Sequence, residues 1–204
     1  PGDEDAHASL GYALLDAGDI AGANAEWEAA LRFGPTQLTT YWLTADLASV
    51  RGDREGARRA IQKAIAVSDA NSLIAQIIVV ESLVGFRDPE LREAAAAVAA
   101  GRRLVDLLPK AGRSWLGLGA ALHRAGDWQG CIDAEERSMR FMAGGTAVHW
   151  YPLAMALEHT GRHEKAVEWR QKADGWMEQH HAKNPLLVLF RDEGLVFLLL
   201  LFLL

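Results

Sequence analysis

Small and apolar residues recur along the chain at fixed distances from four glycines, and this spacing predicts a repeated helical unit. The glycines lie between helix-like stretches and are Gly18, Gly52, Gly126 and Gly161. The first two are 34 residues apart and the last two 35, whereas the middle interval is 74 residues. A fixed period of roughly 20 to 50 residues is typical of stacked repeats. The middle interval leaves room for one more repeat with a short insertion, so we expect five repeats.

Four columns of similar side chains surround these glycines. Eleven residues before each glycine the side chains are mostly aromatic: His7, Tyr41, Trp115 and Trp150. Seven residues before it they are small: Gly11, Ala45, Gly119 and Ala154. Five residues after it they are again small: Ala23, Ala57, Cys131 and Ala166. Twelve residues after it stand Ala30, Ala64, Ser138 and Ala173.

These columns predict a helical hairpin in each repeat. We expect a small residue of the first helix to face a small residue of the second, so that the two helices approach closely. Large side chains such as Trp27, Ile61 and Trp115 then fill the space beside that contact, because protein interiors are closely packed.

The turn of each hairpin is also predicted from residue type. Glycine ends the first helix because the chain must adopt a left-handed conformation there, which costs other residues more. In three hairpins an aspartate follows and is expected to accept hydrogen bonds from the first amides of the second helix: Asp19, Asp53 and Asp127. Pro35 and Pro109 are expected to end second helices because proline lacks an amide proton.

The third repeat is irregular. We expect a first helix over Asn71–Val84, a longer turn over 85–89, and a long, alanine-rich second helix over Glu90–Leu108. Ala97 lies 34 residues before Cys131. The repeat register is therefore regained by Ala97, which confines the insertion to the turn.

These columns resemble the tetratricopeptide repeat family over about residues 4 to 180. The second half is the most similar, in RAGDWQGCIDAEERSM and WYPLAMALEHTGRHEKAVEWRQKADGWMEQ. It looks like the tetratricopeptide arrays at the C-terminal ends of bacterial serine/threonine protein kinases. The resemblance implies an all-α superhelix, or solenoid, of about five helical hairpins, followed here by a C-terminal apolar helix. It also implies a role in binding other proteins.

We place the array at residues 4–183 and a capping helix or hydrophobic tail at 184–204. The expected repeats span approximately 4–37, 38–71, 72–111, 112–146 and 147–180. Glu135 and Arg170 depart from the family, which usually has a bulky apolar residue at those positions. The last two hairpins are therefore expected to be looser. Pro152 indicates a first helix that begins near Trp150, with the proline in its first turn.

The resemblance implies that the first helix of each pair lines a concave face. The residues expected there are Tyr12, Trp42, Asp46, Gln76, His123, Tyr151 and Met155. Some arrays of this family grip a C-terminal carboxylate with lysine and asparagine at positions occupied here by Ala8, Trp42, Gln76, Leu116 and Tyr151. Because no lysine is among them, we expect an extended or helical segment held by aromatic and apolar contacts, with Asp46 and His123 adding polar specificity. The alternative is that these side chains only pack against neighbouring helices.

Composition narrows the classes of partner. A net charge of −6 with scattered Lys and Arg argues against nucleic acid as a partner. The single cysteine, Cys131, excludes an internal disulfide. The chain begins at Pro1 and shows no signal peptide, so we expect a piece of a longer or processed protein in the cytoplasm.

The sequence lacks the patterns that carry catalysis or metal binding. There is no HExxH or CxxC, no phosphate-binding glycine loop, and none of the kinase motifs. His159 and His163 lie on either side of Gly161 and so do not share a helix face. We expect no catalytic residue, no metal site and no cofactor.

The last residues, LVFLLLLFLL, have no polar face. A membrane span needs about 20 apolar residues, and charged residues at 191–193 limit this run to ten. Three interpretations remain: a buried terminal helix, the start of a longer membrane segment, or non-native sequence. A membrane is expected as a partner only under the second.

Together these features predict a protein-interaction scaffold of bacterial signalling type that binds a peptide or partner protein and is not an enzyme. One alternative is a non-catalytic regulatory segment of a larger bacterial serine/threonine kinase. A second alternative is a membrane-tethered assembly factor, which depends on the C-terminal run.

Overall fold

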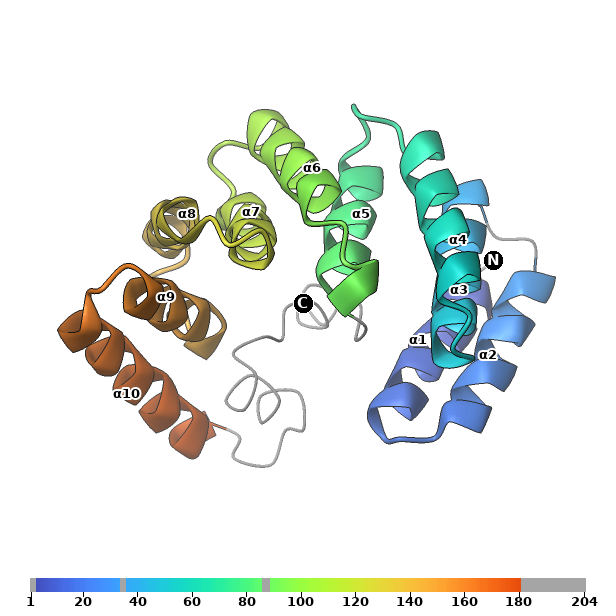
Figure 1. Cartoon of the computed structure of the whole chain (residues 1–204), viewed down its shortest axis with the longest axis horizontal. Helices are drawn as coiled ribbons and strands as arrows, with labels where there is room; N and C mark the ends of the chain where they lie inside the picture. Colours follow the sequence, from blue (N-terminus) through green and yellow to red (C-terminus); the bar gives the residue numbers. More distant parts are fainter. Residues whose placement is uncertain (1–2, 34–35, 86–88, 181–204) are drawn as a thin grey trace. The chain divides into compact units, whose positions relative to one another are not determined.

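The computed structural model describes residues 3–33, 36–85 and 89–180. Over these residues it contains ten α-helices and one short 3₁₀ helix, and each odd-numbered α-helix packs against the helix that follows it (Figure 1). The elements are α1 (Asp3–Asp16), α2 (Ile20–Arg32), α3 (Gln37–Val50), α4 (Arg54–Val67), α5 (Leu73–Gly85), η1 (Pro89–Leu91), α6 (Ala94–Leu107), α7 (Gly112–Arg124), α8 (Trp128–Phe141), α9 (Ala147–His159) and α10 (His163–His180). The predicted fold of five helical hairpins is therefore confirmed.

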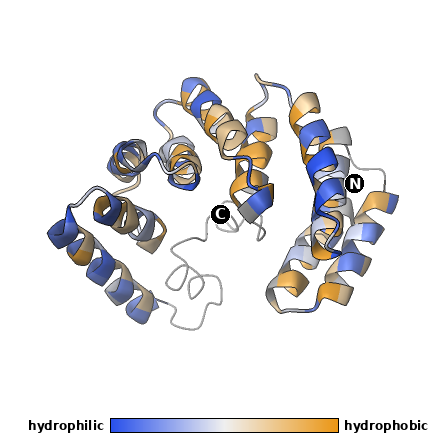
Figure 2. Ribbon diagram, in the orientation of Figure 1, coloured by the Kyte–Doolittle hydropathy of each residue, from blue (hydrophilic) through white to orange (hydrophobic). Residues whose placement is uncertain are grey.

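The chain divides into two compact units. The first contains α1 to α4 together with η1, and the second contains α5 to α10. Figure 2 shows that apolar residues run along most of α5, whereas α8 and α10 carry many polar residues. The predicted C-terminal apolar helix lies outside the described residues. No helix among the described residues is long and apolar enough to cross a membrane.

The four turns have the predicted conformation. Gly18, Gly52, Gly126 and Gly161 all have positive φ angles, between 72° and 83°. The side chains of Asp19, Asp53 and Asp127 cap the following helices by accepting the amide of a residue three positions later, at 2.8 to 2.9 Å.

The residue whose amide the aspartate accepts is itself a glycine each time, which was not predicted: Gly22, Gly56 and Gly130. A Cβ atom on any of the three would overlap the carboxylate that caps it. Each turn is therefore a five-residue Gly-Asp-x-x-Gly unit in which the second glycine makes room for the cap.

The third hairpin differs from its prediction, because its second helix is shorter. Helix α6 begins at Ala94, and Pro89–Leu91 form η1 instead of a first helical turn. Leu91 is buried, and Glu90 forms ion pairs with Arg54 at 3.2 Å and Arg58 at 3.6 Å, both on α4. Pro89–Leu91 thus pack against α4 and do not extend α6.

The expectation for Pro152 was wrong. Helix α9 begins at Ala147, so Pro152 lies inside the helix, where it removes the hydrogen bond to the Val148 carbonyl. The earlier start has a local cause. The Thr146 amide donates to Nδ1 of His149 at 3.1 Å, which satisfies an amide at the start of the helix.

In the first and fourth hairpins, the small residue of the first helix accommodates a large side chain of the second. The atoms nearest to a Cβ placed on Gly11 belong to Trp27, and those nearest to Gly119 belong to Glu135. Trp27 and Glu135 each lie nine residues after the turn glycine, as do Ile61 and Arg170. In these two hairpins the helices therefore approach through a small-to-large contact, and the predicted contact between the small columns stays a prediction.

Glu135 and Arg170, the two residues that depart from the family pattern, lie in different environments. Glu135 is fully buried at 0% exposure, and neither carboxylate oxygen has a hydrogen-bond partner in the part of the chain that the structure describes. Burial raises the pKa of Glu135 well above its usual value. Arg170, in contrast, is exposed. The fourth hairpin therefore carries an acid in its core, and the fifth places its charged residue at the surface.

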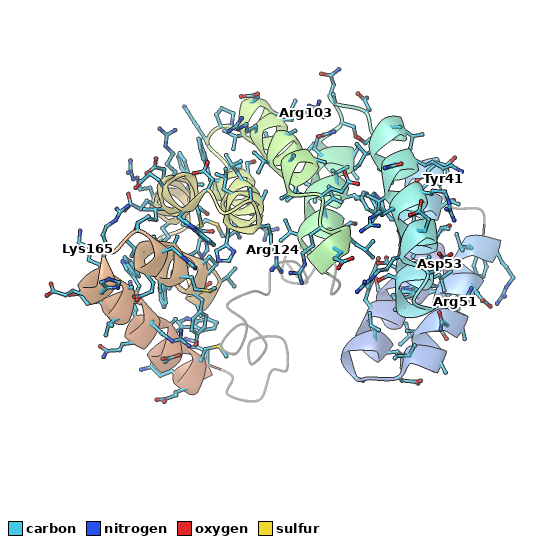
Figure 3. The ribbon with its side chains drawn as sticks, in the orientation of Figure 1. Tyr41, Arg51, Asp53, Arg103, Arg124 and Lys165 are labelled. Atoms are coloured by element: carbon cyan, nitrogen blue, oxygen red, sulfur yellow. The ribbon has the colours of Figure 1, made fainter. Side chains whose placement is uncertain are left out.

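A cation–π contact recurs at the ends of three hairpins and was not predicted. The aromatic residue eleven positions before the turn glycine meets a cation eleven positions after it. The pairs are Lys63 over Tyr41 at 5.8 Å, Arg137 over Trp115 at 4.6 Å and Lys172 over Trp150 at 4.3 Å. Figure 3 shows Tyr41 away from the turn residues Arg51 and Asp53 of the same hairpin. The contact therefore joins the two helices at the end opposite the turn.

The glycine after each cap provides a first test. Asp53→Ala is expected to cost about 1 kcal/mol of unfolding free energy because it removes the cap. Gly56→Ala is expected to be stabilising by roughly 0.5–1 kcal/mol only when Asp53 is already alanine, since otherwise the methyl group displaces the cap. Urea unfolding of both single variants and the double variant measures this coupling. As a control, the effects of Gln62→Ala and Asp53→Ala on the unfolding free energy are expected to add. If the effects of Gly56→Ala and Asp53→Ala also add, the role of Gly56 is contradicted.

Glu135 provides a second test. Because its pKa is raised in the folded protein, folding binds a proton there, and the stability that this provides at low pH is lost as pH rises above the ordinary value near 4.5. Glu135→Met is therefore expected to increase the free energy of unfolding at pH 7 by about 1–3 kcal/mol, with a smaller gain at pH 5. Thermal unfolding monitored by circular dichroism measures both. The control is Glu136→Met, which changes the exposed neighbouring glutamate. A lower Tm for Glu135→Met would contradict the interpretation of Glu135 as an uncompensated buried acid.

Candidate partner-binding site

The seven residues predicted for the concave face fall into two groups by exposure. Tyr12, Asp46 and Met155 are partly exposed. The others are almost fully buried: Trp42 at 3%, Gln76 at 0%, His123 at 5% and Tyr151 at 2%. Tyr12, Trp42 and Asp46 belong to the first unit and the remaining four to the second. The accessible members are therefore a pair in the first unit and Met155 in the second.

The pair in the first unit is joined by a direct hydrogen bond. The Tyr12 hydroxyl on α1 donates to Oδ2 of Asp46 on α3 at 2.5 Å. The two residues are 34 positions apart, one repeat period, so they occupy equivalent places on successive first helices. The structure thus brings together two of the predicted residues from adjacent repeats.

The Tyr12 ring is held by the core of the same unit. Its edge-on contact with Trp27 has a centroid distance of 5.1 Å, and Trp27 Nε1 donates to the Ala8 carbonyl at 3.2 Å. Trp27 belongs to a buried cluster that includes Leu43 and Leu47 of α3. Packing therefore fixes the direction of the Tyr12 hydroxyl before any partner arrives.

Asp46 lies in an environment that disfavours its charge. Burial raises its pKa to about 7, and the hydrogen bond from Tyr12 opposes this shift without cancelling it. Among the described residues, no basic side chain forms an ion pair with Asp46. Asp46 is therefore a carboxyl group that titrates near neutral pH and lacks a counter-ion in the described part of its own unit.

In the second unit, His123 is part of a stack of rings. Its ring meets Trp128 edge-on at 5.2 Å, and Trp128 stacks on His159 at 4.0 Å. Neither nitrogen of His123 has a hydrogen-bond partner among the described residues. Burial lowers the pKa of His123 to about 4, with smaller contributions from Arg124 and His159. The imidazole is therefore neutral and acts as a packing group.

Tyr151, another predicted residue of the second unit, is also engaged in the fold. The Tyr151 hydroxyl donates to Oδ1 of Asp174 on α10 at 2.6 Å. Next to His123, Arg124 donates from Nε to the Val84 carbonyl on α5 at 3.3 Å (Figure 3). Met155 remains the accessible apolar group of the predicted set in this unit.

A buried polar chain between the fourth and fifth hairpins was not predicted. Nε2 of His149 lies 3.2 Å from Oγ of Ser138, which donates to the Gly112 carbonyl at 2.8 Å. Because Nδ1 of His149 accepts the Thr146 amide, the proton of the neutral ring lies on Nε2 and is donated to Ser138. A histidine in that state does not accept the serine proton, so the pair joins two repeats and does not form a nucleophile.

The sequence held only weak signals for this chain. Ser138 stands in a column of small residues, and nothing near His149 in the sequence identifies a hydrogen-bond partner eleven positions earlier. Among the described residues there is no group of three potential metal ligands.

Comparisons with known proteins support the fold. No protein-family model matches the chain, and no curated protein is significantly similar to it. TTC0263, a thermophilic TPR protein of Thermus thermophilus, matches with a TM-score of 0.62 and 18% identity, over 94% of this chain and 98% of that one. A structure of MamA matches at 0.50 with 22% identity, over 86% and 98%. The MSR-1 form of MamA matches at 0.52 with 15% identity, over 88% and 99%.

At these identities the likenesses show the fold alone. The chain has the tetratricopeptide type of architecture over most of its length. The likenesses provide no link to the kinase-associated arrays suggested by the second half of the sequence.

Because His123 and His149 are buried, we expect the protein to lose stability in acid. The pKa values of His123 and His149 are both lowered to about 4, so the folded state binds fewer protons than the unfolded state. Their contribution is fully present above pH 6.5 and is lost as pH falls toward 4. His123→Phe is expected to reduce this loss by roughly 2 kcal/mol at about pH 4, measured by urea unfolding from about pH 7 to 4. An unchanged pH profile in His123→Phe, matching that of the control variant His163→Gln, would refute the assignment.

Proposed function

We propose that this chain is a non-catalytic scaffold that binds a peptide or an extended segment of a partner protein on the first helices of its hairpins. The observation that carries the proposal is the Tyr12–Asp46 pair. It presents an oriented hydroxyl and a carboxyl group at a partly exposed place shared by two successive repeats. Holding a carboxyl group in this environment costs stability, because burial disfavours its charge.

Polar groups held at such a cost are typical of recognition sites. A rigid aromatic side chain beside a fixed polar group is also typical of the few residues that dominate binding energy at protein interfaces. Tyr12 combines both features, because Trp27 fixes its ring and Asp46 accepts from its hydroxyl. Met155 adds a flexible apolar contact in the second unit, and unbranched thioether side chains adapt well to a partner.

Residues that are almost fully buried are poor choices for a binding test. A polar or charged substitution at Trp42, Gln76, His123 or Tyr151 would change the stability of the fold together with any affinity. The test therefore uses the partly exposed members of the predicted set. A bacterial source, a role in signalling and a cytoplasmic location remain predictions.

Selection of a random 12-residue peptide phage library on the intact chain provides the ligand for this test. A selected peptide that binds the first unit is expected to bind Tyr12→Ala about tenfold or more weakly, and one that binds the second unit is expected to do the same with Met155→Ala, measured by fluorescence anisotropy. Far-UV circular dichroism establishes that each variant is folded. Gln62→Ala, at an exposed site on α4, is the matched control. Full affinity in both Tyr12→Ala and Met155→Ala, or no enriched peptide at all, would refute the proposed function.

A further inference from the structure

Asp46 is the one acidic residue of the seven predicted contact residues, and no basic side chain among the described residues forms an ion pair with it. Its hydrogen bond is with the neutral Tyr12 hydroxyl, and that bond uses Oδ2. The other carboxylate oxygen, Oδ1, is not one of the fully buried polar atoms that lack a hydrogen-bond partner among the described residues. Because the residue is partly exposed and Oδ1 has no partner in the described chain, this oxygen is within reach of a group from outside.

Apart from Arg32, which is exposed at the end of α2, the lysines and arginines of the described first unit and its His7 are engaged at other places. His7 pairs with Glu26, Arg51 with Glu28, Arg54 and Arg58 with Glu90, Arg59 with Glu55, and Lys63 lies over Tyr41. Neither these groups nor any carboxylate of the elements packed on α3 contributes to the electrostatic environment of Asp46, which is set by burial and by Tyr12. The described part of the unit has therefore not provided the carboxylate with a counter-ion of its own.

We infer that the first unit recognises a basic side chain, lysine or arginine, of its partner through Oδ1 of Asp46, with the Tyr12 ring beside it. This inference rests on the proposed function and specifies the chemistry of its ligand. A partly buried carboxylate forms its strongest hydrogen bonds with charged donors. The aromatic ring of Tyr12 provides a surface for the methylene groups of lysine or for the plane of a guanidinium group.

The overall charge of the chain agrees with this choice. A net charge of −6 attracts a basic segment and increases its association rate. A neutral hydrogen-bond donor on the partner would also fit beside Asp46, but it would leave the carboxylate uncompensated. The two kinds of ligand therefore differ in how their affinity responds to removal of the charge.

The decisive experiment compares the intact chain with Asp46→Asn in the same random 12-residue phage selection at pH 8. The asparagine still accepts the Tyr12 hydrogen bond but has no charge. We expect lysine and arginine to be enriched at one peptide position on the unmodified chain and to lose that enrichment on Asp46→Asn. Asp106→Asn, which removes one exposed acidic charge from α6, is the matched control and is expected to retain the enrichment.

The selected peptide then provides a double-mutant cycle. Replacing its basic residue with norleucine is expected to weaken binding about tenfold or more to the intact chain and less than about threefold to Asp46→Asn. Because the pKa of Asp46 is about 7, the affinity of the basic peptide is expected to increase about tenfold between pH 6 and pH 8. The norleucine peptide is expected to lack this dependence.

The outcomes separate this inference from the proposed function. Peptides that bind in a Tyr12-dependent way without basic enrichment, or an equal norleucine effect on both proteins, would overturn the basic-residue inference and leave the scaffold proposal intact. The absence of any selected peptide would overturn both.

Discussion

The structure depends on the turn between the two helices of each hairpin. A glycine with positive φ reverses the chain, and in three hairpins an aspartate then caps the next helix through the amide of a second glycine. This short unit sets the register of the two helices. Because the register is the same each time, residues at equal distances before and after the turn meet. Tyr41 meets Lys63, Trp115 meets Arg137 and Trp150 meets Lys172 in this way.

The same register places Tyr12 and Asp46 one period apart on successive first helices, where they form a hydrogen bond. It also places Glu135 at the position occupied by Trp27 in the first hairpin, inside the contact with a small residue of the first helix. Two acidic groups are thus held by the same architecture in different ways. Asp46 has a neutral partner and access to solvent, whereas Glu135 has neither among the described residues. Of these two acids, Asp46 alone can take part in recognition without opening the fold.

The four acids and histidines with shifted pKa values have opposite effects on stability. Asp46 and Glu135 have raised pKa values, so their contributions decrease as pH rises. His123 and His149 have lowered pKa values, so theirs decrease as pH falls. The imidazole of His149 is compensated by two hydrogen bonds that join the fourth and fifth hairpins. His149 therefore connects two repeats, whereas Asp46 remains partly exposed.

The sequence by itself determined the number of hairpins, the left-handed turn glycines and the aspartate caps. These features depend on residues close to one another in the chain and recur at a fixed period, so a single pattern reveals them. Tertiary structure decided which of the seven candidate residues a partner can reach. Exposure of Tyr12, Asp46 and Met155, and burial of Trp42, Gln76, His123 and Tyr151, depend on neighbouring helices that no local pattern identifies. Tertiary structure likewise decided the short α6, the position of Pro152 within α9 and the lack of a counter-ion for Asp46 among the described residues. Each depends on contacts between residues that are distant in the sequence or on a cap formed only in the folded chain.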